Sequence, residues 1–301
     1  MITLWNITLL AVLLGSIDSS QPSEIKVFEK FGEHEPKLEN AVKEIMSFFK
    51  MIGLVEPYWP CPEPTSLAPC VCSSPDELST DIDCSDVNSD EELAQSFTAT
   101  FSFPMVRTLT IQPAERSSLH TFSSETFGVQ SFQNVIVSNT MLQEIQDGAF
   151  AESRDYLVSL DLSDNNIVTF PYESLASYTL LENLNLQKNN LGFQDFVHIE
   201  SDSLKSVDMS FNTGLYRESN LFGACPKLSD VNMNDCAITE LGSNIFGALS
   251  SLTHLDLSNN NLTSLKVNDI TPPSTSMKYL NLNNNYISNM EDGAITGEKK
   301  H

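Results

Sequence analysis

Basic residues are scarce in this chain. Its 301 residues include 16 Lys and Arg against 40 Asp and Glu, which gives a formal net charge of −24. A field of that sign repels nucleic-acid phosphates and anionic lipid headgroups. We therefore expect neither a nucleic-acid partner nor a membrane partner. Hydrophobic residues make up 41% of the chain, which predicts a folded core.

Catalytic signatures are also missing. The sequence holds no G-x-S-x-G, H-E-x-x-H, P-loop or dinucleotide-binding motif. Pairs of acidic residues occur often, but a chain with 40 carboxylates contains such pairs by chance. We interpret them as part of a solvated surface. The histidines are too scattered to indicate a metal site; they are His34, His120, His198, His254 and His301. We expect no catalytic residues, no cofactor and no metal, and hence a protein that is not an enzyme.

Long apolar runs are limited to one, Met1 to Ile17, which is short for a membrane span. Small residues follow it at Ser19 and Ser20. We interpret residues 1–19 as a signal peptide. The alternative is an uncleaved anchor, because no Lys or Arg precedes the run. The mature protein is expected to be soluble, secreted and extracellular.

A repeat dominates the rest of the chain. The pattern L-x-x-L-x-L-x-x-N-x-L occurs as LVSLDLSDNNI from Leu157, LENLNLQKNNL from Leu181 and LTHLDLSNNNL from Leu252. Weaker copies begin at Val106, Phe132, Leu204, Leu228 and Met277, so that starts are 23 to 26 residues apart. Both pattern and period are those of leucine-rich repeats. Residues 106–301 are therefore predicted to form eight repeats.

The spacing predicts an α/β solenoid, or horseshoe, with a concave parallel sheet. Each L-x-L segment alternates in and out as a short strand, and one copy cannot bury its apolar row alone, so copies stack. Eight strands about 4.8 Å apart span roughly 34 Å. An apolar residue 18 positions after most starts should fill the convex side: Phe150, Leu175, Ile199, Phe222, Phe246, Ile270 and Ile295.

Asparagine recurs at the ninth position of the repeat, where a buried amide can bridge the backbones of adjacent turns. These residues are Asn165, Asn189, Asn212, Asn260 and Asn285, with Thr140 and Cys236 in two other copies. Cys225 and Cys236 share one repeat, with a strand between them. Their Cα atoms should be farther apart than the roughly 7 Å that a disulfide permits. We predict two buried thiols.

Residues 20–60 precede the repeats and differ from them. From Pro36 to Ile52 the apolar residues have helical spacing: Leu38, Val42, Ile45, Phe49 and Ile52. We expect this helix to pack on the N-terminal cap; the alternative is a partner-binding or oligomerising helix. A proline-rich segment then leads into the cap. Residues 61–105 then form a cysteine-rich cap with Cys61, Cys70, Cys72 and Cys84, whose spacing alone allows three disulfide pairings.

The cap carries a family resemblance. The segments CPEPTSLAPCVC (61–72), DIDCSDVNSDEELAQSF (81–97) and FSFPMVRTLTI (101–111) resemble a secreted crustacean family. That family comprises the non-catalytic leucine-rich-repeat subunits of luciferin 2-monooxygenase and their arthropod relatives. The resemblance implies pairing of Cys61 with Cys72 and of Cys70 with Cys84, as in the cysteine-rich flanks of extracellular leucine-rich-repeat proteins. It also implies a companion of a small catalytic subunit, with no active site here and no required role in luminescence.

The concave positions of the repeats are mostly polar and mildly acidic. Phe211, His254 and Tyr279 are the best candidates for partner contact, grouped on the later repeats. We expect an extracellular protein-binding scaffold, as a companion subunit of a secreted oxidase. One alternative is innate-immune recognition of microbial or glycan surfaces; another is a merely solvated concave face.

Two features concern the surface of the last repeats. Asn261-Leu262-Thr263 is the only glycosylation sequon after the signal peptide, and Asn261 should be exposed and modified. No cysteine follows Cys236, so a disulfide-bonded C-terminal cap is not expected. The repeat that begins at Met277 should dock on a partner or form a homodimer. The alternatives are an incomplete gene product, or shielding by Glu298, Lys299 and Lys300.

Overall fold

The computed structural model describes residues 60–75, 79–192, 198–213, 221–242, 244–270 and 277–295. The chain divides into two compact units, Met1–Trp59 and Pro60–His301, and all described residues belong to the second. The expected signal peptide, the predicted helix at 36–52 and the last six residues lie outside the described residues. No helix within the described ranges is long and apolar enough to cross a membrane.

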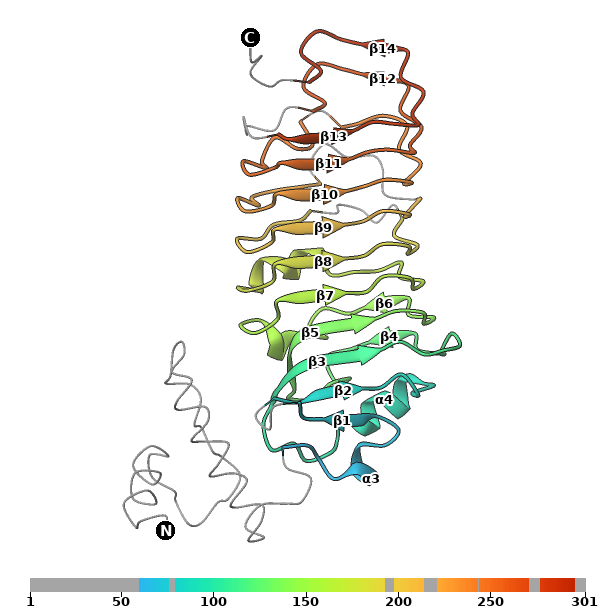
Figure 1. Cartoon of the computed structure of the whole chain (residues 1–301), viewed down its shortest axis with the longest axis vertical. Coiled ribbons are helices and arrows are strands. Elements are labelled where there is room, and N and C mark those ends of the chain that lie inside the picture. Colours follow the sequence, from blue (N-terminus) through green and yellow to red (C-terminus); the bar gives the residue numbers. More distant parts are fainter. Residues whose placement is uncertain are drawn as a thin grey trace, which may run out of the picture. The chain divides into compact units, whose positions relative to one another are not determined.

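The second unit is a solenoid with one ten-stranded sheet (Figure 1). Each expected repeat supplies one strand, and equivalent positions of neighbouring repeats pair in register. These eight strands are parallel: β3 (Met105–Ile111), β5 (Ser131–Val137), β7 (Ser159–Asp161), β8 (Asn183–Asn185), β9 (Ser206–Asp208), β10 (Asp230–Asn232), β11 (His254–Asp256) and β13 (Tyr279–Asn281). The predicted leucine-rich-repeat solenoid with a parallel sheet is confirmed.

The sheet has two strands more than the eight repeats predict, and both come from the cap. β2 (Asp81–Asp83) pairs parallel with β3, and β1 (Val71–Ser73) pairs antiparallel with β2. The sequence therefore predicted two strands too few for this sheet. The cap does more than cover the first repeat, because it continues the hydrogen-bonded ladder and pairs the edge of β3 that would otherwise be open.

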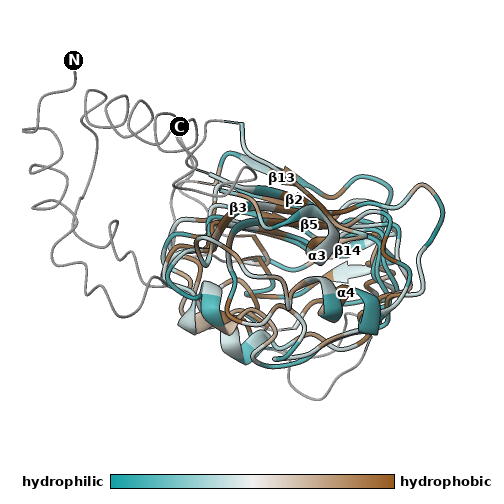
Figure 2. Ribbon diagram, turned by 90° about the horizontal axis from the view of Figure 1, so that it is seen from below, coloured by the Kyte–Doolittle hydropathy of each residue, from teal (hydrophilic) through white to brown (hydrophobic). Residues whose placement is uncertain are grey.

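The core lies between the sheet and the opposite side of the coil. The central residue of each strand points inward, as the buried pairs Leu160↔Leu184 and Val207↔Val231 show. The expected second row fills the convex side, with Phe150, Leu175, Ile199, Phe222, Phe246 and Ile270 all buried. Ile295, in the last described repeat, is 40% exposed. Hydrophobic strand segments and hydrophilic outer turns are visible along the stack in Figure 2.

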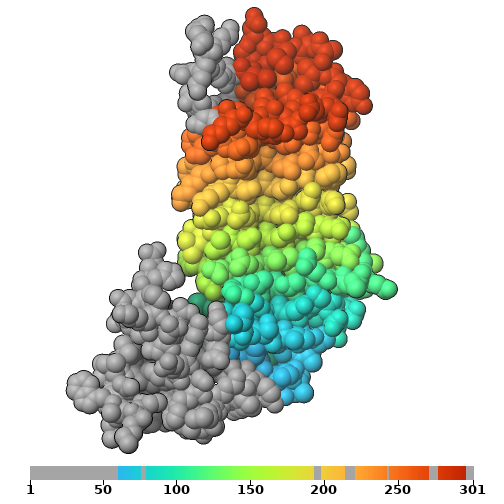
Figure 3. Space-filling model, viewed as in Figure 1, coloured from blue at the N-terminus to red at the C-terminus, as the bar shows by residue number. Residues whose placement is uncertain are grey.

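The described residues of the convex side form short elements. Two small parallel pairs lie there, β4 (Thr121–Phe122) with β6 (Glu144–Ile145) and β12 (Ser264–Leu265) with β14 (Asn289–Met290). Two 3-10 helices, η1 (Ala151–Ser153) and η2 (Tyr172–Ser177), complete it. Between the cap and the first repeats, Phe97 packs edge-on against Phe127 and Phe132 with ring centroids 5.2 and 5.8 Å apart. The repeats follow one another as bands in direct contact (Figure 3).

The predicted asparagine ladder is confirmed. Asn189 is typical: its amide Nδ2 donates to the carbonyl of Leu162 in the preceding repeat at 2.8 Å and to that of Leu186 in its own repeat at 3.1 Å. Its Oδ1 accepts from the backbone N–H of Ile167 at 2.9 Å. One side chain thus satisfies three buried backbone groups that no sheet partner reaches.

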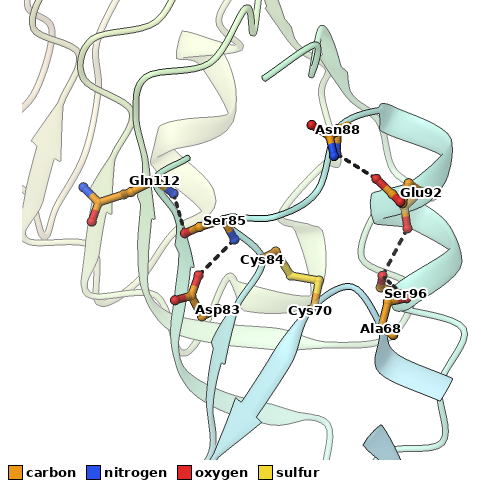
Figure 4. Close-up of a disulfide and its surroundings, with 9 residues drawn as sticks. All are labelled: Ala68, Cys70, Asp83, Cys84, Ser85, Asn88, Glu92, Ser96 and Gln112. Carbon is orange, nitrogen blue, oxygen red and sulfur yellow. Dashed lines mark hydrogen bonds between the residues drawn. A yellow bond between two sulfur atoms is a disulfide. The ribbon is translucent and has the colours of Figure 1, made fainter. Parts of the chain in front are cut away.

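The cap is held by two disulfides, Cys61–Cys72 and Cys70–Cys84, which is the pairing that the resemblance implied. Its two short helices are α3 (Pro64–Leu67) and α4 (Asp90–Ser96). Around the Cys70–Cys84 bridge, Ser96 Oγ donates to the carbonyls of Ala68 and Glu92 at 3.4 and 3.1 Å (Figure 4). Disulfide and helix therefore fix the same end of the cap.

Helix α4 joins the cap to the first repeat. Ser89 is its N-cap and accepts from the N–H of Glu92 at 3.2 Å. The carboxylate of Asp90, in the first turn, accepts from the backbone N–H groups of His120 and Thr121 at 2.7 and 3.1 Å. The contact binds α4 to the beginning of β4.

Candidate binding face on the parallel sheet

The outward side of the sheet is formed by the third and fifth residues of each repeat, and we call it the sheet face. The third-position row is Thr108, Asn134, Ser159, Asn183, Ser206, Asp230, His254 and Tyr279. The fifth-position row is Thr110, Ile136, Asp161, Asn185, Asp208, Asn232, Asp256 and Asn281. The face is polar, as the sequence predicted, and it contains neither Lys nor Arg in these rows.

The fifth-position row alternates Asp and Asn from Asp161 onward, and these side chains are held in place. Asp256 Oδ1 accepts from the backbone N–H of Ser258 at 2.8 Å, and its Oδ2 accepts from Asn281 Nδ2 at 2.9 Å. Asp208 has the same two contacts, with the N–H of Ser210 at 2.9 Å and with Asn232 Nδ2 at 2.9 Å. The carboxylates are thus fixed before any partner binds, which lowers the entropic cost of binding.

His254 and Tyr279 lie side by side on the neighbouring strands β11 and β13. Their ring centroids are 6.2 Å apart and tilted by 36°. His254 Nδ1 lies 3.1 Å from a carboxylate oxygen of Asp230 on β10 and 2.8 Å from Thr253 Oγ1. Tyr279 is 49% exposed. Two adjacent rings, one positioned by a carboxylate, form an exposed aromatic platform at this end of the sheet face.

A hollow of about 260 Å³ lies beside this platform, over strands β9, β10, β11 and β13. It is lined by Ser206, Val207, Asp208, Asp230, Val231, Asn232, His254, Asp256 and Tyr279, and we call it the sheet-face hollow. The carboxylates of Asp208, Asp230 and Asp256 surround it, and no lining residue is Lys or Arg. Such a surface suits a group that donates hydrogen bonds or carries positive charge, with an apolar part against the rings.

Phe211 does not belong to this group. It lies in the turn after β9, 41% exposed, and does not line the sheet-face hollow. The Lys188 ammonium lies 5.9 Å from the centre of its ring. The expectation that Phe211, His254 and Tyr279 form one cluster was therefore wrong. Phe211 is the eighth residue of its repeat, and that position follows the strand.

The eighth position has its own backbone geometry. The residues there have positive φ, which Asn and Asp tolerate better than most residues. They are Asn139, Asp164, Lys188, Phe211, Asp235, Asn259 and Asn284. Phe211, with φ of 58°, is the bulkiest side chain in this row. Phe211 is thus a large, exposed aromatic side chain on a disfavoured backbone conformation. These two properties make it a second, separate candidate for partner contact.

Cys225 and Cys236 are free and buried, so the prediction of buried thiols is confirmed. The two residues do not share one repeat, as we expected, because Cys225 precedes the start of the sixth repeat at Leu228 and belongs to the fifth. Burial raises the pKa of Cys225 to about 11 and that of Cys236 to about 11. Each thiol donates to a backbone carbonyl at 3.3 Å, Cys225 to Ile199 and Cys236 to Met209. Neither is a poised nucleophile, because the thiolate is disfavoured. Within the described ranges, no group of three or more His, Cys, Asp or Glu could hold a metal ion.

The last described repeat is less covered than those before it. Leu280, Leu282 and Ile287 are only partly buried, whereas Leu255, Leu257 and Leu262 at the equivalent positions are fully buried. Met290 is 53% exposed. Docking of this end on a partner, or on a second copy, stays a prediction.

The repeats match two known families of leucine-rich-repeat sequences. Residues 130–191 match the family described as Leucine rich repeat. Residues 200–297 match the BspA type Leucine rich repeat region (6 copies). The two matches cover most of the solenoid beyond its first repeat.

A longer part of the chain is similar to one named protein. The chain is 33% identical over 242 residues to the Oplophorus-luciferin 2-monooxygenase non-catalytic subunit of Oplophorus gracilirostris. The alignment covers 79% of this chain and 66% of that protein, so the chain spans just under two thirds of its relative.

Three solved structures are similar to parts of this chain. TLR13 in its complex with ssRNA13 has a TM-score of 0.45 at 22% identity, over 70% of this chain and 26% of that chain. The leucine-rich-repeat domain of APL1B has a TM-score of 0.41 at 14% identity, over 87% and 70%. The protein LIC12759 of Leptospira interrogans has a TM-score of 0.36 at 19% identity, over 66% and 52%.

Proposed function

The chain belongs to the leucine-rich-repeat family, and we propose that it is a secreted, non-catalytic scaffold that binds a protein partner, the small catalytic subunit of an extracellular oxidase. The similarity to a protein named as a non-catalytic subunit supports this role. We also propose the division into a signal peptide (1–19), a helical segment (20–60), a cap (61–105) and the repeats (106–301).

The sheet-face hollow is the observation that carries the proposal. It offers three oriented carboxylates and two exposed rings, without Lys or Arg among its lining residues. Binding energy concentrates at a few central aromatic and charged contacts in most protein interfaces. We propose that a Lys or Arg side chain of the partner enters the hollow and that an adjacent apolar group packs on Tyr279. Because the chain is strongly acidic, a basic partner is also attracted over longer distances.

Capture from the native secretion tests this function. The full-length protein is immobilised, and the captured protein is assayed for oxygen-dependent oxidation of luciferin. The double variant His254→Ala/Tyr279→Ala should lose about 2 kcal/mol or more of binding free energy, which is about 30-fold in Kd. The matched control, Ser159→Ala/Asn183→Ala, alters the same row of earlier strands and should bind normally.

Three outcomes would overturn the proposal. Equal binding by both double variants would remove the hollow from the interface. Turnover by the isolated chain would make it an enzyme. Binding to bacterial cell walls or glycans, without capture of an oxidase, would favour the innate-immune alternative.

A further inference from the structure

Asn261 begins the sequon Asn261-Leu262-Thr263, between β11 and β12. The chain alternates there, with Leu262 fully buried while Asn261 and Thr263 are exposed on either side of it. The two residues that glycosyl transfer recognises therefore face solvent, and the residue between them holds the segment on the core.

The contrast with the adjacent asparagine is sharp. Asn260 is buried, and its Nδ2 donates to the carbonyls of Met233 and Leu257 at 2.9 and 3.0 Å. The side chain of Asn261 forms no hydrogen bond with any described residue; only its backbone N–H is engaged, donating to the carbonyl of Ile238 at 2.7 Å. A substituent on Nδ2 of Asn261 thus breaks no contact of the folded chain.

The surroundings of Asn261 suit a sugar. The tenth position of the preceding repeat is Ala237, which is small and exposed. The same position in the next repeat is Tyr286, which is 71% exposed and whose N–H donates to the carbonyl of Leu262 at 2.9 Å. Stacked turns lie about 4.8 Å apart, so the ring of Tyr286 lies within reach of the first sugar. An aromatic face next to a sugar ring is buried by the apolar side of that ring.

We propose that Asn261 carries an N-linked glycan that covers Tyr286 and leaves the sheet face open. The inference rests on the proposed secretion, because the donor, a lipid-linked diphosphate oligosaccharide, is met in the secretory pathway. A bond forms between Nδ2 and the anomeric carbon of the first sugar, while the bond from that carbon to the diphosphate oxygen breaks. The diphosphate leaves with the electron pair, and the amide nitrogen loses one proton.

The glycan is placed away from the partner surface. Asn261 follows the turn after β11, whereas the sheet-face hollow is lined from the strands themselves. Glycosylation and partner binding are therefore compatible, and loss of the glycan should leave binding at the hollow unchanged. Its local effect is to shield Tyr286 in the last described repeat.

The full-length chain is expressed in insect cells, and the medium is analysed before and after treatment with peptide N-glycosidase. We expect one mobility shift, together with conversion of Asn261 to Asp in the released peptide. The shift should disappear in Asn261→Gln and Thr263→Ala but persist in Thr263→Ser. Asn6→Gln, which removes the sequon of the predicted signal peptide, should also keep it.

Each failure has a separate meaning. Absence of the wild-type chain from the medium would overturn the proposed secretion and, with it, the glycan. A secreted chain without a shift, or a shift retained in Asn261→Gln, would overturn the glycan alone. If Asn261→Gln is not secreted, the Thr263→Ala and Thr263→Ser pair and the peptide analysis decide the question.

Iodination tests the contact with Tyr286. Labelling of Tyr286 should rise after deglycosylation, whereas Tyr279 on the sheet face serves as the internal reference and should not change. Equal labelling of Tyr286 before and after treatment would show that the glycan does not cover it.

Discussion

The side-chain oxygen of Asn260 accepts a hydrogen bond from the backbone N–H of Cys236 at 3.0 Å, across the boundary between two repeats. The same oxygen accepts from the N–H of Ile238 at 3.0 Å, while Nδ2 donates to the carbonyls of Met233, Leu257 and Ser258. Asn260 is buried, so water cannot replace these contacts. One amide therefore ties two repeats together at the point where the backbone leaves the sheet.

The first prediction follows from this amide. Asn260→Leu leaves the N–H groups of Cys236 and Ile238 and the carbonyl of Met233 without a partner. The carbonyl of Leu257 still accepts from Asn285 Nδ2 at 2.9 Å. Each unsatisfied buried group costs about 1–3 kcal/mol. We expect a loss of at least about 3 kcal/mol in the free energy of unfolding, measured by urea denaturation. Asn261→Leu is the matched control on the exposed neighbour and should change it by less than about 0.5 kcal/mol. Similar losses in the two variants would contradict the ladder.

Phe211 leads to the second prediction. Its φ of 58° lies in the left-handed region, which costs most residues about 1–2 kcal/mol but is tolerated by Asn. Phe211→Asn should raise the free energy of unfolding by about 1 kcal/mol, less what the contact with Lys188 contributes. The reciprocal change, Asn259→Phe, places the strained residue at the same position two repeats later and should destabilise. Destabilisation by Phe211→Asn would show that packing outweighs backbone strain.

The repeats could be predicted from sequence because their period fixes which residues of neighbouring strands pair and which residues are buried. Once Leu157 and Leu181 are aligned, the pairing of Leu160 with Leu184 and the burial of Asn165 and Asn189 follow without further information. The same alignment placed Cys225 and Cys236 apart. Each position is set by contacts with the equivalent position one repeat away, and such contacts are visible in the sequence.

The cap was harder, because its contacts are not periodic. The strands β1 and β2 have three residues each, too few for an alternation to be recognised. Helix α4 did leave a signal, since Ser89 followed by Glu92 is a capping pair, and it was missed. Grouping Phe211 with His254 failed for a different reason. Both lie on later repeats, but the eighth position follows the strand and leaves the sheet face.

The disulfides give the third prediction. The two bridges close loops of similar length, 11 and 14 residues, so they constrain the unfolded chain to a similar degree. Cys70 and Cys84 are buried, whereas Cys72 is only partly buried. Cys70→Ala/Cys84→Ala should therefore cost about 3 kcal/mol or more, and Cys61→Ala/Cys72→Ala should cost less. Thermal unfolding measures both; the opposite order would show that burial of the bridge is unimportant.

The fourth prediction concerns the pH dependence of stability. Burial raises the pKa of Cys225 and of Cys236 to about 11, from an ordinary value of 9.0. Above pH 9 the unfolded chain loses these two protons while the folded chain keeps them, so ionisation favours unfolding. The contribution of the two protonated thiols to the free energy of unfolding is complete below pH 9 and is lost as the pH rises through 11.

Tyrosines complicate the alkaline limb, because burial also raises the pKa of Tyr178, to about 12, and that of Tyr172. Their effect has the same sign and remains in a variant without the thiols. The useful quantity is therefore the difference between the wild type and Cys225→Ala/Cys236→Ala. The wild type should lose stability more steeply between pH 9 and 11, as measured by denaturant titration at fixed pH.

Neither thiol should react with a disulfide reagent at pH 8 until the protein is unfolded. Parallel curves, or rapid labelling of the native protein, would mean that these thiols are accessible to solvent.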